Sequence, residues 1–245
     1  PWSDQREYIS RVVISDNITT IGDCAFYEFK NIRSITLGNK VTTIGERAFE
    51  DCYNLQSVRI GNKVSIIKRA AFSDCQNLSQ LTLGTSLVTI ENYAFANCSN
   101  LRKLTIPDKV ATIGYEAFAG ATNLTSVKLG ASLKEIGGYA FDGCTNLESL
   151  TMGNKLTTIG YHFRNAGALK SLTIPSSVTS IEYDAFRNCV GLEKVSISGG
   201  CEIGNQAFEG CISLKTLSLG SKVTSIGNYA FNECNLTSVT IPNST

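Results

Sequence analysis

The chain has 245 residues, of which 42% are hydrophobic and 18% are charged, and its formal net charge is +1. This hydrophobic fraction is sufficient for a continuous apolar core. No run approaches the roughly 18 consecutive apolar residues that a membrane-spanning helix needs, and no secretory signal pattern is present. Direct membrane insertion is therefore not expected.

Residues 1–20 are the first predicted element, an N-terminal cap with part of a repeat. We expect Trp2 and Tyr8 to cover the first coil. The chain opens on PWSD without a Met and stops at IPNST within a repeat, so we also expect an excerpt of a longer protein. No Pro/Gly/Ser-rich linker follows, so residues 1–245 are predicted to form a single domain.

A unit of 23 residues, occasionally 22, repeats through residues 21–245. Ile marks its start at positions 21, 44, 67, 90, 113, 136, 159, 181, 203 and 226, and an Ala-Phe pair follows in most units. The seventh unit has lost one residue and contains His162-Phe163 instead. A fixed period of about 20 to 29 residues with an L-x-x-L-x-L core is typical of a leucine-rich-repeat solenoid. The pattern predicts ten stacked repeats, the last incomplete.

Each unit contains the same short elements in chain order, as residues 44–66 illustrate. The stretch 45–52 has good helix formers and is predicted to form one helical or 3₁₀ turn that buries Ala48 and Phe49. Leu55, Val58 and Ile60 then alternate with polar residues, which predicts a short half-buried strand. Gly61 begins a turn, and a β-branched run such as 41–44 favours a second extended segment. The predicted fold class is an α/β solenoid, a right-handed superhelix with short parallel strands on one face and helical turns on the other.

Two further positions of the repeat are occupied by the same residue type in most units and so form columns along the stack. Seven of the nine cysteines occupy one position of the repeat: Cys52, Cys75, Cys98, Cys144, Cys189, Cys211 and Cys234. Ala121 and Ala166 fill the same column, which favours buried thiols, although some stacked disulfides or a metal site stay open. Zinc sites typically use C-x₂-C pairs, which the chain lacks, so we expect no metal. A second column contains Asn31, Asn54, Asn77, Asn100, Asn123 and Asn146, whose amides are predicted to bond backbone groups where the coil bends.

These columns together resemble the BspA-like (Treponema pallidum type) leucine-rich repeats of bacterial and some protozoan surface proteins. The family pattern LxxLxIPxxVTxIGxxAFxxCxxL is matched almost letter for letter by LRKLTIPDKVATIGYEAFAGATNL at 101–124. The resemblance covers about residues 9–245. It implies the solenoid fold, export to the cell surface or the extracellular space, and in some relatives adhesion to host matrix proteins or other microbes.

Residues for catalysis are scarce. The only histidine, His162, stands where other units have Ala beside Phe, and we interpret it as an accommodation of the deletion. The chain contains no P-loop, no G-x-G-x-x-G opening a long helix and no H-E-x-x-H. We therefore predict a non-enzymatic protein without cofactors.

Charge is distributed unevenly around the coil. The segments between each marker Ile and the following Leu carry 13 acidic and six basic residues, whereas the residues around each L-x-L are mostly Ser, Thr, Lys and Arg. Since charges one coil apart lie within a Debye length of about 8 Å, they add along the stack. The basic residues that we predict to contact a ligand are Arg33, Arg59, Arg102, Lys103, Lys128, Lys170, Lys194 and Lys215.

Both the basic strand residues and the tyrosines of the repeat have alternatives to ligand binding. Lys and Arg on exposed strands can also serve to prevent aggregation between sheet edges. Six tyrosines flank the Ala-Phe pair on the other side, where packing between coils is an alternative to a partner contact. They are Tyr93, Tyr139 and Tyr229, with Tyr115, Tyr161 and Tyr183 one position earlier.

The sequence favours a recognition or adhesion module that binds an extracellular protein or an acidic glycan through its strand face. A structural spacer that displays another domain is the main alternative, and a cytosolic regulator is a third. Nucleic acid is not expected as a partner, because no aromatic residues alternate with the Lys and Arg residues of the strand face. Nothing after Ile241 resembles a polar cap, so the open last coil could pair with another chain.

Overall fold

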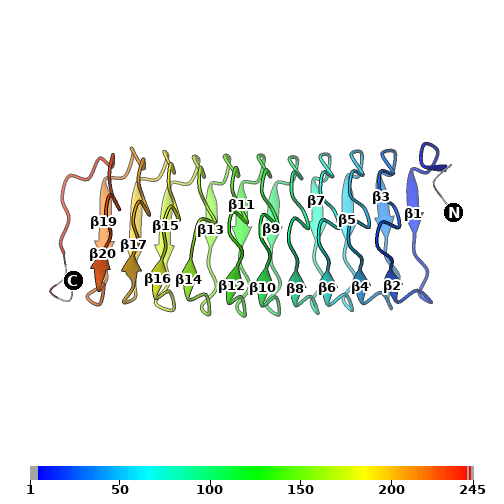
Figure 1. The fold of residues 1–245 in the computed structure, drawn as a ribbon, viewed down its shortest axis with the longest axis horizontal. Helices are drawn as coiled ribbons and strands as arrows, with labels where there is room; N and C mark the ends of the chain where they lie inside the picture. The colour runs from blue at the N-terminus through cyan, green and yellow to red at the C-terminus, as the bar shows by residue number, and fades with distance from the viewer. Residues whose placement is uncertain (1–4, 242, 244–245) are drawn as a thin grey trace.

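The protein forms a long stack of coils in a computed structural model that describes residues 5–241 and 243. The two ends of the chain lie at opposite ends of the stack (Figure 1). Each coil contributes a longer strand to one side and a two-residue strand to the other. Trp2, which we expected to cover the first coil, lies outside the described residues. Tyr8 is largely exposed, so its ring does not cover the core.

Each longer strand begins two residues after a Leu or Ile, as β5 does after Leu55. They are β1 (Arg11–Val13), β3 (Ser34–Thr36), β5 (Ser57–Arg59), β7 (Gln80–Thr82), β9 (Lys103–Thr105), β11 (Ser126–Lys128), β13 (Ser149–Thr151), β15 (Ser171–Ile174), β17 (Lys194–Ile197) and β19 (Thr216–Leu219). Nine turns of the solenoid therefore separate β1 from β19.

The shorter strands end on the marker isoleucines. They are β2 (Thr20–Ile21), β4 (Thr43–Ile44), β6 (Ile66–Ile67), β8 (Thr89–Ile90), β10 (Thr112–Ile113), β12 (Glu135–Ile136), β14 (Thr158–Ile159), β16 (Ser180–Ile181), β18 (Glu202–Ile203) and β20 (Ser225–Ile226).

Strand pairing is parallel and keeps the sequence period. Ile35 of β3 pairs with Val58 of β5, and Ile44 of β4 pairs with Ile67 of β6, each one repeat along the chain. The longer strands form three sheets, β1-β3-β5-β7, β9-β11-β13 and β15-β17-β19, and the shorter ones form two, β2 to β12 and β14 to β20. The breaks in the two sides fall between different coils, so no coil boundary loses both ladders.

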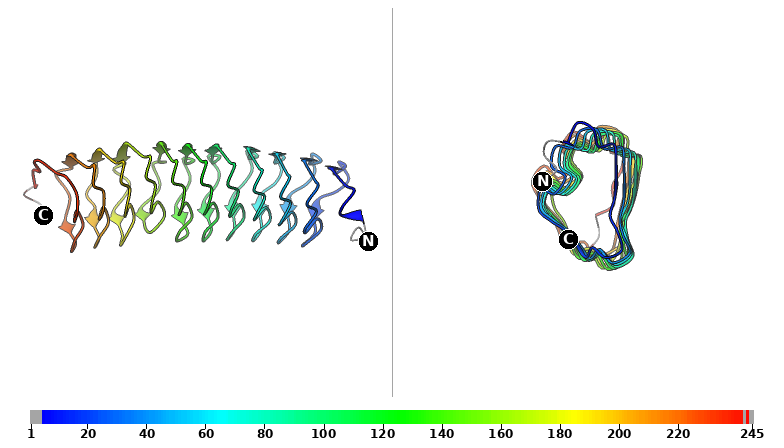
Figure 2. Two further views of the ribbon diagram at one scale, coloured as in Figure 1. Left: turned by 90° about the horizontal axis from the view of Figure 1, so that it is seen from above. Right: turned by 90° about the vertical axis from the view of Figure 1, so that its right-hand side faces the viewer.

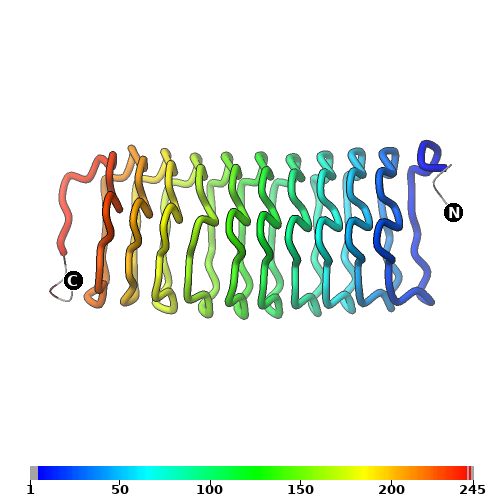
Figure 3. The backbone as a smooth tube through the Cα atoms, in the orientation of Figure 1, coloured from blue at the N-terminus to red at the C-terminus, as the bar shows by residue number. Residues whose placement is uncertain are grey.

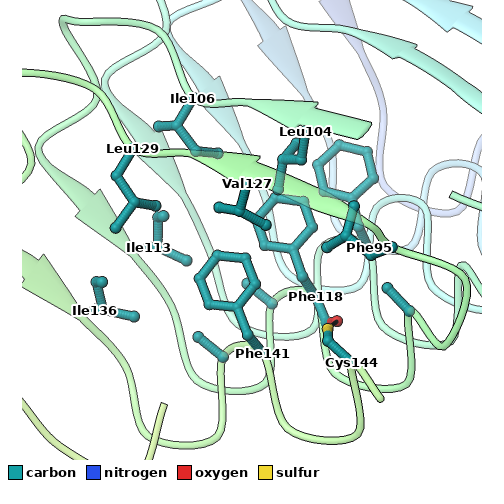
Figure 4. Packing of buried hydrophobic residues seen from close by; sticks show 14 of the residues in the cluster. Phe95, Leu104, Ile106, Ile113, Phe118, Val127, Leu129, Ile136, Phe141 and Cys144 are labelled. Atoms are coloured by element: carbon teal, nitrogen blue, oxygen red, sulfur yellow. Dashed lines mark hydrogen bonds between the residues drawn. The ribbon is translucent and has the colours of Figure 1, made fainter. Parts of the chain in front are cut away.

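A single hydrophobic core runs through the stack. Phe49, Phe72 and Phe95 are fully buried, and their ring planes are nearly parallel, with centroids 5.1 and 5.2 Å apart. Ring stacking continues from Phe26 to Phe231, and in Figure 4 the rings of Phe95, Phe118 and Phe141 lie one above another beside strand residues. The predicted spine of side chains one repeat apart is therefore confirmed.

The predicted helical turn after each marker Ile is wrong. In residues 45–52 the backbone makes consecutive β-turns, in which the Ala48 N–H donates to the Gly45 carbonyl and the Cys52 N–H donates to the Phe49 carbonyl. The alternate N–H groups point out of the coil, so that the Phe49 N–H donates to Ala71 of the next coil at 2.8 Å. This alternation requires left-handed residues, of which Arg47 (φ 55°) and Asp51 (φ 61°) are two.

Coil spacing explains why helices are excluded. Parallel strands repeat at about 4.8 Å, whereas a helix with its side chains is about 10 Å across, so helices on one side would force the coils apart there. The β-turns repeat at the same spacing as the strands, so both sides of each coil have the same thickness. As a result the coils superimpose in the view along the stack, and the chain path repeats with little curvature (Figures 2 and 3). The side opposite the longer strands is therefore a layer of β-turns and not the helical face that we expected.

The cysteine column lies inside the core as free thiols, as predicted, with Cys234 partly exposed in the last coil. Each Sγ also donates to the backbone of the preceding coil: the Cys98 Sγ lies 3.3 Å from the Phe72 carbonyl oxygen. Burial raises the pKa of the Cys52 and Cys144 thiols to about 12. These thiols therefore act as small core groups that also satisfy a carbonyl.

The asparagine column differs in part from the prediction. Asn31 and Asn146 donate to backbone carbonyls of Glu7 and Thr122, as expected. In the middle of the stack the amides instead bond one another, with Asn100 Nδ2 3.2 Å from Asn77 Oδ1 and Asn123 repeating the contact on Asn100. A continuous amide ladder thus runs along the edge of the turn layer.

The shortened seventh coil retains its place in the core. Phe163 stacks between Phe141 and Phe186 at 5.2 and 5.7 Å. His162 occupies the usual Ala position and is only 5% exposed. The coil after it buries Asp184, whose carboxylate lies 3.4 Å from Arg187. The deletion therefore leaves the phenylalanine stack unbroken.

Candidate interaction surface

The strand face consists of the exposed side chains of the longer strands and of the residue before each strand. It forms because the middle residue of each strand points into the core, which leaves its two neighbours in solvent. In β5 the buried residue is Val58, and Arg59 is exposed. The same alternation holds in β11, where Val127 is buried and Lys128 is exposed.

All eight basic residues predicted to contact a ligand are exposed on this face. The structure distributes them over three columns. Arg33, Arg102, Lys170 and Lys215 precede their strands, Lys103 and Lys194 begin strands, and Arg59 and Lys128 occupy the third strand position. Within a column they do not stack directly, since Lys128 pairs with Thr105 and Thr151 and Lys194 pairs with Ser171 and Thr216. The structure therefore does not unite them in one cluster.

Acidic residues divide the face into two parts. Glu148 and Glu193 alternate with Lys170 and Lys215 in the column before the strands of the C-terminal half. The Lys170 Nζ lies 3.5 Å from a carboxylate oxygen of Glu193. From β3 to β11 the strand face carries no acidic residue. The positive potential is therefore concentrated over the N-terminal half.

A gap in the strand ladder lies within this basic half. In the described part of the chain, β7 and β9 belong to different sheets although they are neighbours in the stack. The turn after β9 begins with Pro107, where most coils have Gly. A Cβ on Gly84 would lie 2.2 Å from the carbonyl oxygen of the preceding coil, and one on Gly130 would lie 2.3 Å from its counterpart, so these turns approach too closely for a side chain. The ring of Pro107 prevents the same close approach to Gly84, which accounts for the gap between the two coils.

A groove of about 630 Å³ lies at this gap. Its lining combines the ammonium groups of Lys103, Lys109 and Lys128 with the hydroxyls of Thr82 and Thr105. Leu81 and Leu83, which a regular coil would bury, are only partly buried here. The groove therefore offers cations, hydrogen-bond donors and a small apolar floor together.

A second gap tests this explanation. β13 and β15 are also in different sheets, and the later coil begins its turn with Pro175. The groove there is smaller, about 350 Å³, and it is lined by Glu148 and Met152 without a Lys or Arg. Both gaps follow the same substitution of Pro for Gly, but only the first gap is basic.

The sequence reasoning missed Lys109, Leu81 and Leu83 as parts of a site. Lys109 belongs to the turn after the strand, and the leucines fit the core pattern of every repeat. The signal that could have found them is Pro107 in a position that is Gly in the neighbouring repeats. Its consequence depends on how close adjacent turns approach, which the sequence does not display.

Little in the described residues suggests catalysis. Burial lowers the pKa of His162 to about 4, so the imidazole is neutral and enclosed at neutral pH. Across residues 5–241 and 243 there is no group of three or more His, Cys, Asp or Glu side chains arranged to hold a metal ion. The same residues contain no helix of the length and apolar character that a membrane crossing requires.

Comparisons with known proteins agree with this architecture. The family model of the BspA type Leucine rich repeat region (6 copies) matches residues 5–124, 88–202 and 192–245. Among solved structures, a leucine-rich repeat protein from Bacteroides ovatus is 27% identical, with 94% of this chain and 75% of that chain covered and a TM-score of 0.56.

Two further solved structures share the fold at lower identity. A leucine-rich repeat protein from Eubacterium ventriosum is 21% identical over 100% of this chain and 89% of that chain, with a TM-score of 0.58. The leucine-rich repeat protein of T. pallidum is 22% identical over 85% and 78%, with a TM-score of 0.51. A search of curated proteins finds no match.

Proposed function

The chain belongs to the family of BspA-type leucine-rich repeats, and from that premise we propose that it is a non-enzymatic recognition module that binds an acidic extracellular partner through its strand face. The partner is a sulfated or otherwise anionic glycan, or an acidic patch on a protein. The chain acts at the cell surface or outside the cell, as its resemblance to bacterial surface proteins implies.

The observation that carries the proposal is the basic groove between β7 and β9. Three lysines converge on its lining, and the strand face around it has no carboxylate to neutralise them. Asp108 is the acidic residue of the lining, and its Oδ1 accepts the Ala131 N–H at 3.1 Å, so part of its charge is used to hold the next turn. An anion with hydroxyl groups, such as a sulfated sugar, matches this combination of cations and threonines.

Two substitutions test the groove without disturbing the fold. Lys103→Ser and Lys128→Thr install residues that already occupy the same strand positions, at Ser126 and Thr105. We expect wild-type protein to bind a heparin column, and the double variant to elute at lower salt with about tenfold weaker affinity, because two cations leave the site.

The matched control is Lys30→Thr with Lys134→Ala, which removes the same charge from outside the strand face. Thr and Ala occupy the corresponding positions at Thr122 and Ala111. This control should elute close to wild type. Failure of wild type to bind at about 50 mM salt, or equal losses in both variants, would rule out the groove as the site.

A structural spacer is the second candidate, and the nearly straight stack favours it. The two ends of the chain lie far apart along the solenoid axis (Figure 1). A spacer needs only its length, so it tolerates the loss of any coil, whereas a recognition module loses binding only when the coils of its site are removed.

A further inference from the structure

A second surface lies on the turn side and consists of five tyrosines, one from each of five successive coils. This tyrosine stripe contains Tyr93, Tyr115, Tyr139, Tyr161 and Tyr183. Successive ring centroids are 5.5, 5.8, 5.5 and 6.0 Å apart, so the rings contact one another across five coils. Three of the four contacts are edge-to-face, with interplanar angles of 69 to 78°. The stripe is thus a continuous aromatic line parallel to the axis of the stack.

The fold does not require tyrosine at these positions. Where other coils have Asn92 and Asn205, the side-chain oxygen accepts the N–H of the next coil at 2.9 and 2.8 Å. The tyrosines at 115 and 183 occupy the same position of the repeat and cannot accept that bond in the same way. They also stay 37% and 43% exposed, unlike the buried phenylalanines one column away. The rings pack against one another, and those of Tyr115 and Tyr183 still leave part of their surface in solvent.

A groove of about 730 Å³ runs beside the stripe and is lined by residues of five consecutive coils. Gly114, Gly137 and Gly160 contribute to its lining, while Thr112 and Thr158 supply hydroxyls. Tyr115 and Tyr161 belong to both the groove and the stripe. The ring line and the hydrogen-bonding groups therefore form one elongated surface.

The charge of this surface differs from that of the strand face. Glu91, Glu135 and Glu182 line the groove together with Lys134. Arg69 and Arg164 lie over rings of the stripe, so the charges of this surface nearly balance. His162 also lies there, and its burial keeps it neutral at physiological pH. This balance disfavours anionic polymers, including the acidic glycans proposed for the other face.

We propose that the tyrosine stripe and its groove bind a linear neutral polysaccharide that runs along the solenoid axis. Tyrosine rings offer apolar surface against which sugar rings can pack, and their hydroxyls keep a polar edge in water. Arg69 and Arg164 lie over the rings of Tyr93 and Tyr139, so the sugar contacts rest mainly on the exposed rings of Tyr115 and Tyr183. Carboxylates and threonine hydroxyls alongside accept and donate hydrogen bonds to the sugar hydroxyls. A repeating polymer fits a surface that repeats at every coil, whereas a folded protein partner has no such period.

Two asparagine substitutions remove the two exposed rings of the stripe with little risk to the fold. Tyr115→Asn and Tyr183→Asn restore the residue found at Asn92, Asn205 and Asn228 in the same position. The control is Tyr229→Gln, which removes an exposed tyrosine beyond the stripe at a position that is Gln206 in the preceding coil. Thermal unfolding monitored by circular dichroism verifies that all variants are folded.

Affinity electrophoresis in gels that contain a soluble linear β-glucan provides the measurement. Wild type and Tyr229→Gln should be retarded equally, and the double variant should bind about tenfold more weakly. The Lys103→Ser/Lys128→Thr variant should be retarded like wild type, so the two proposed sites are separable. Absence of retardation of wild type, or retardation that persists in the tyrosine double variant, overturns the proposal.

Discussion

At the residue scale, single side chains serve the core and the neighbouring backbone at once. The cysteines fill a narrow column, and each thiol reaches the Phe carbonyl of the coil before it, as Cys75 does to Phe49 at 3.3 Å. Ala121 fills the same space without a donor. The alternation of Cys and Ala thus reflects a hydrogen bond that the coil can use but does not require.

The thiols should react very differently with a solvent-borne reagent. Cys24 is exposed, whereas the column is buried except for the partly exposed Cys234, and burial raises the pKa of Cys52 and Cys144 to about 12. In native protein we expect fast labelling of Cys24, slower labelling of Cys234 and protection of the remainder until unfolding. Mass spectrometry of partially labelled protein checks this order, and rapid labelling of Cys98 would contradict it.

Removal of one thiol should have a moderate cost. Cys98→Ala loses the hydrogen bond to Phe72 and leaves a small void, so we expect a loss of about 1 to 2 kcal/mol in the free energy of unfolding. Urea denaturation measures the change. The reverse substitution, Ala121→Cys, adds a donor at the same position and should be neutral or stabilising.

His162 should make the protein sensitive to acid. Its pKa is about 4 in the folded chain and 6.5 as a free side chain, so the unfolded chain takes up the proton first as the pH falls. Its contribution to stability is fully present above pH 6.5 and is lost as the pH falls towards 4, by about 3 kcal/mol. Urea unfolding of wild type and His162→Ala at pH 7 and 4.5 tests this. The variant should lose less stability than wild type on acidification, and identical pH dependences would contradict the assignment.

At the element scale, the turn layer and the gaps in the strand ladder decide the shape of the surface. Both features depend on the distance between successive coils. Left-handed residues such as Asp74 (φ 59°) direct backbone donors to the next coil, as the Asp74 N–H does to Ala96 at 2.8 Å. Pro107 and Pro175 prevent the closest approach and open the ladder where they occur.

Replacement of Pro107 by Gly should close the first gap. We expect β7 and β9 to pair, with slower hydrogen exchange of the amides in residues 80–82 and 103–105, because the turn can then approach Gly84 as other glycine turns do. The groove should narrow, and heparin affinity should decrease. Unchanged exchange in these strands would show that the proline does not cause the gap.

At the scale of the whole molecule, the coils form a nearly one-dimensional array. Each coil contacts its neighbours, so removal of a complete coil should leave a shorter but folded stack. The position of the deletion distinguishes the two candidate functions. A recognition module depends on which coil is lost, and a spacer depends only on how many remain.

Two deletions of one coil each make this comparison. Removal of residues 126–148 takes Lys128 and part of the basic groove, so it should weaken heparin binding. Removal of residues 194–215 leaves the groove complete and should preserve binding, with a similar small loss in thermal stability. Size-exclusion chromatography and circular dichroism confirm folding. Equal binding by the two shortened proteins would favour the spacer.

The sequence by itself determined the period, the direction of pairing and the residues of the core. In a stack of equal coils each buried column is visible as a column of apolar letters, which is why the Phe spine and the exposure of Arg59 or Lys128 could be predicted. Likewise the eight basic residues lie on the strand face, as predicted, because strand alternation assigns each residue to one side.

The tertiary structure alone decided how adjacent coils meet. The turn layer was predicted as helical because propensities describe one segment, whereas its N–H groups find their partners in the next coil. The effect of Pro107 depends on the carbonyl that a glycine turn would approach, and the tyrosine stripe depends on rings from five coils that meet at one edge. These features arise from contacts between repeats, which the letters of a single repeat do not contain.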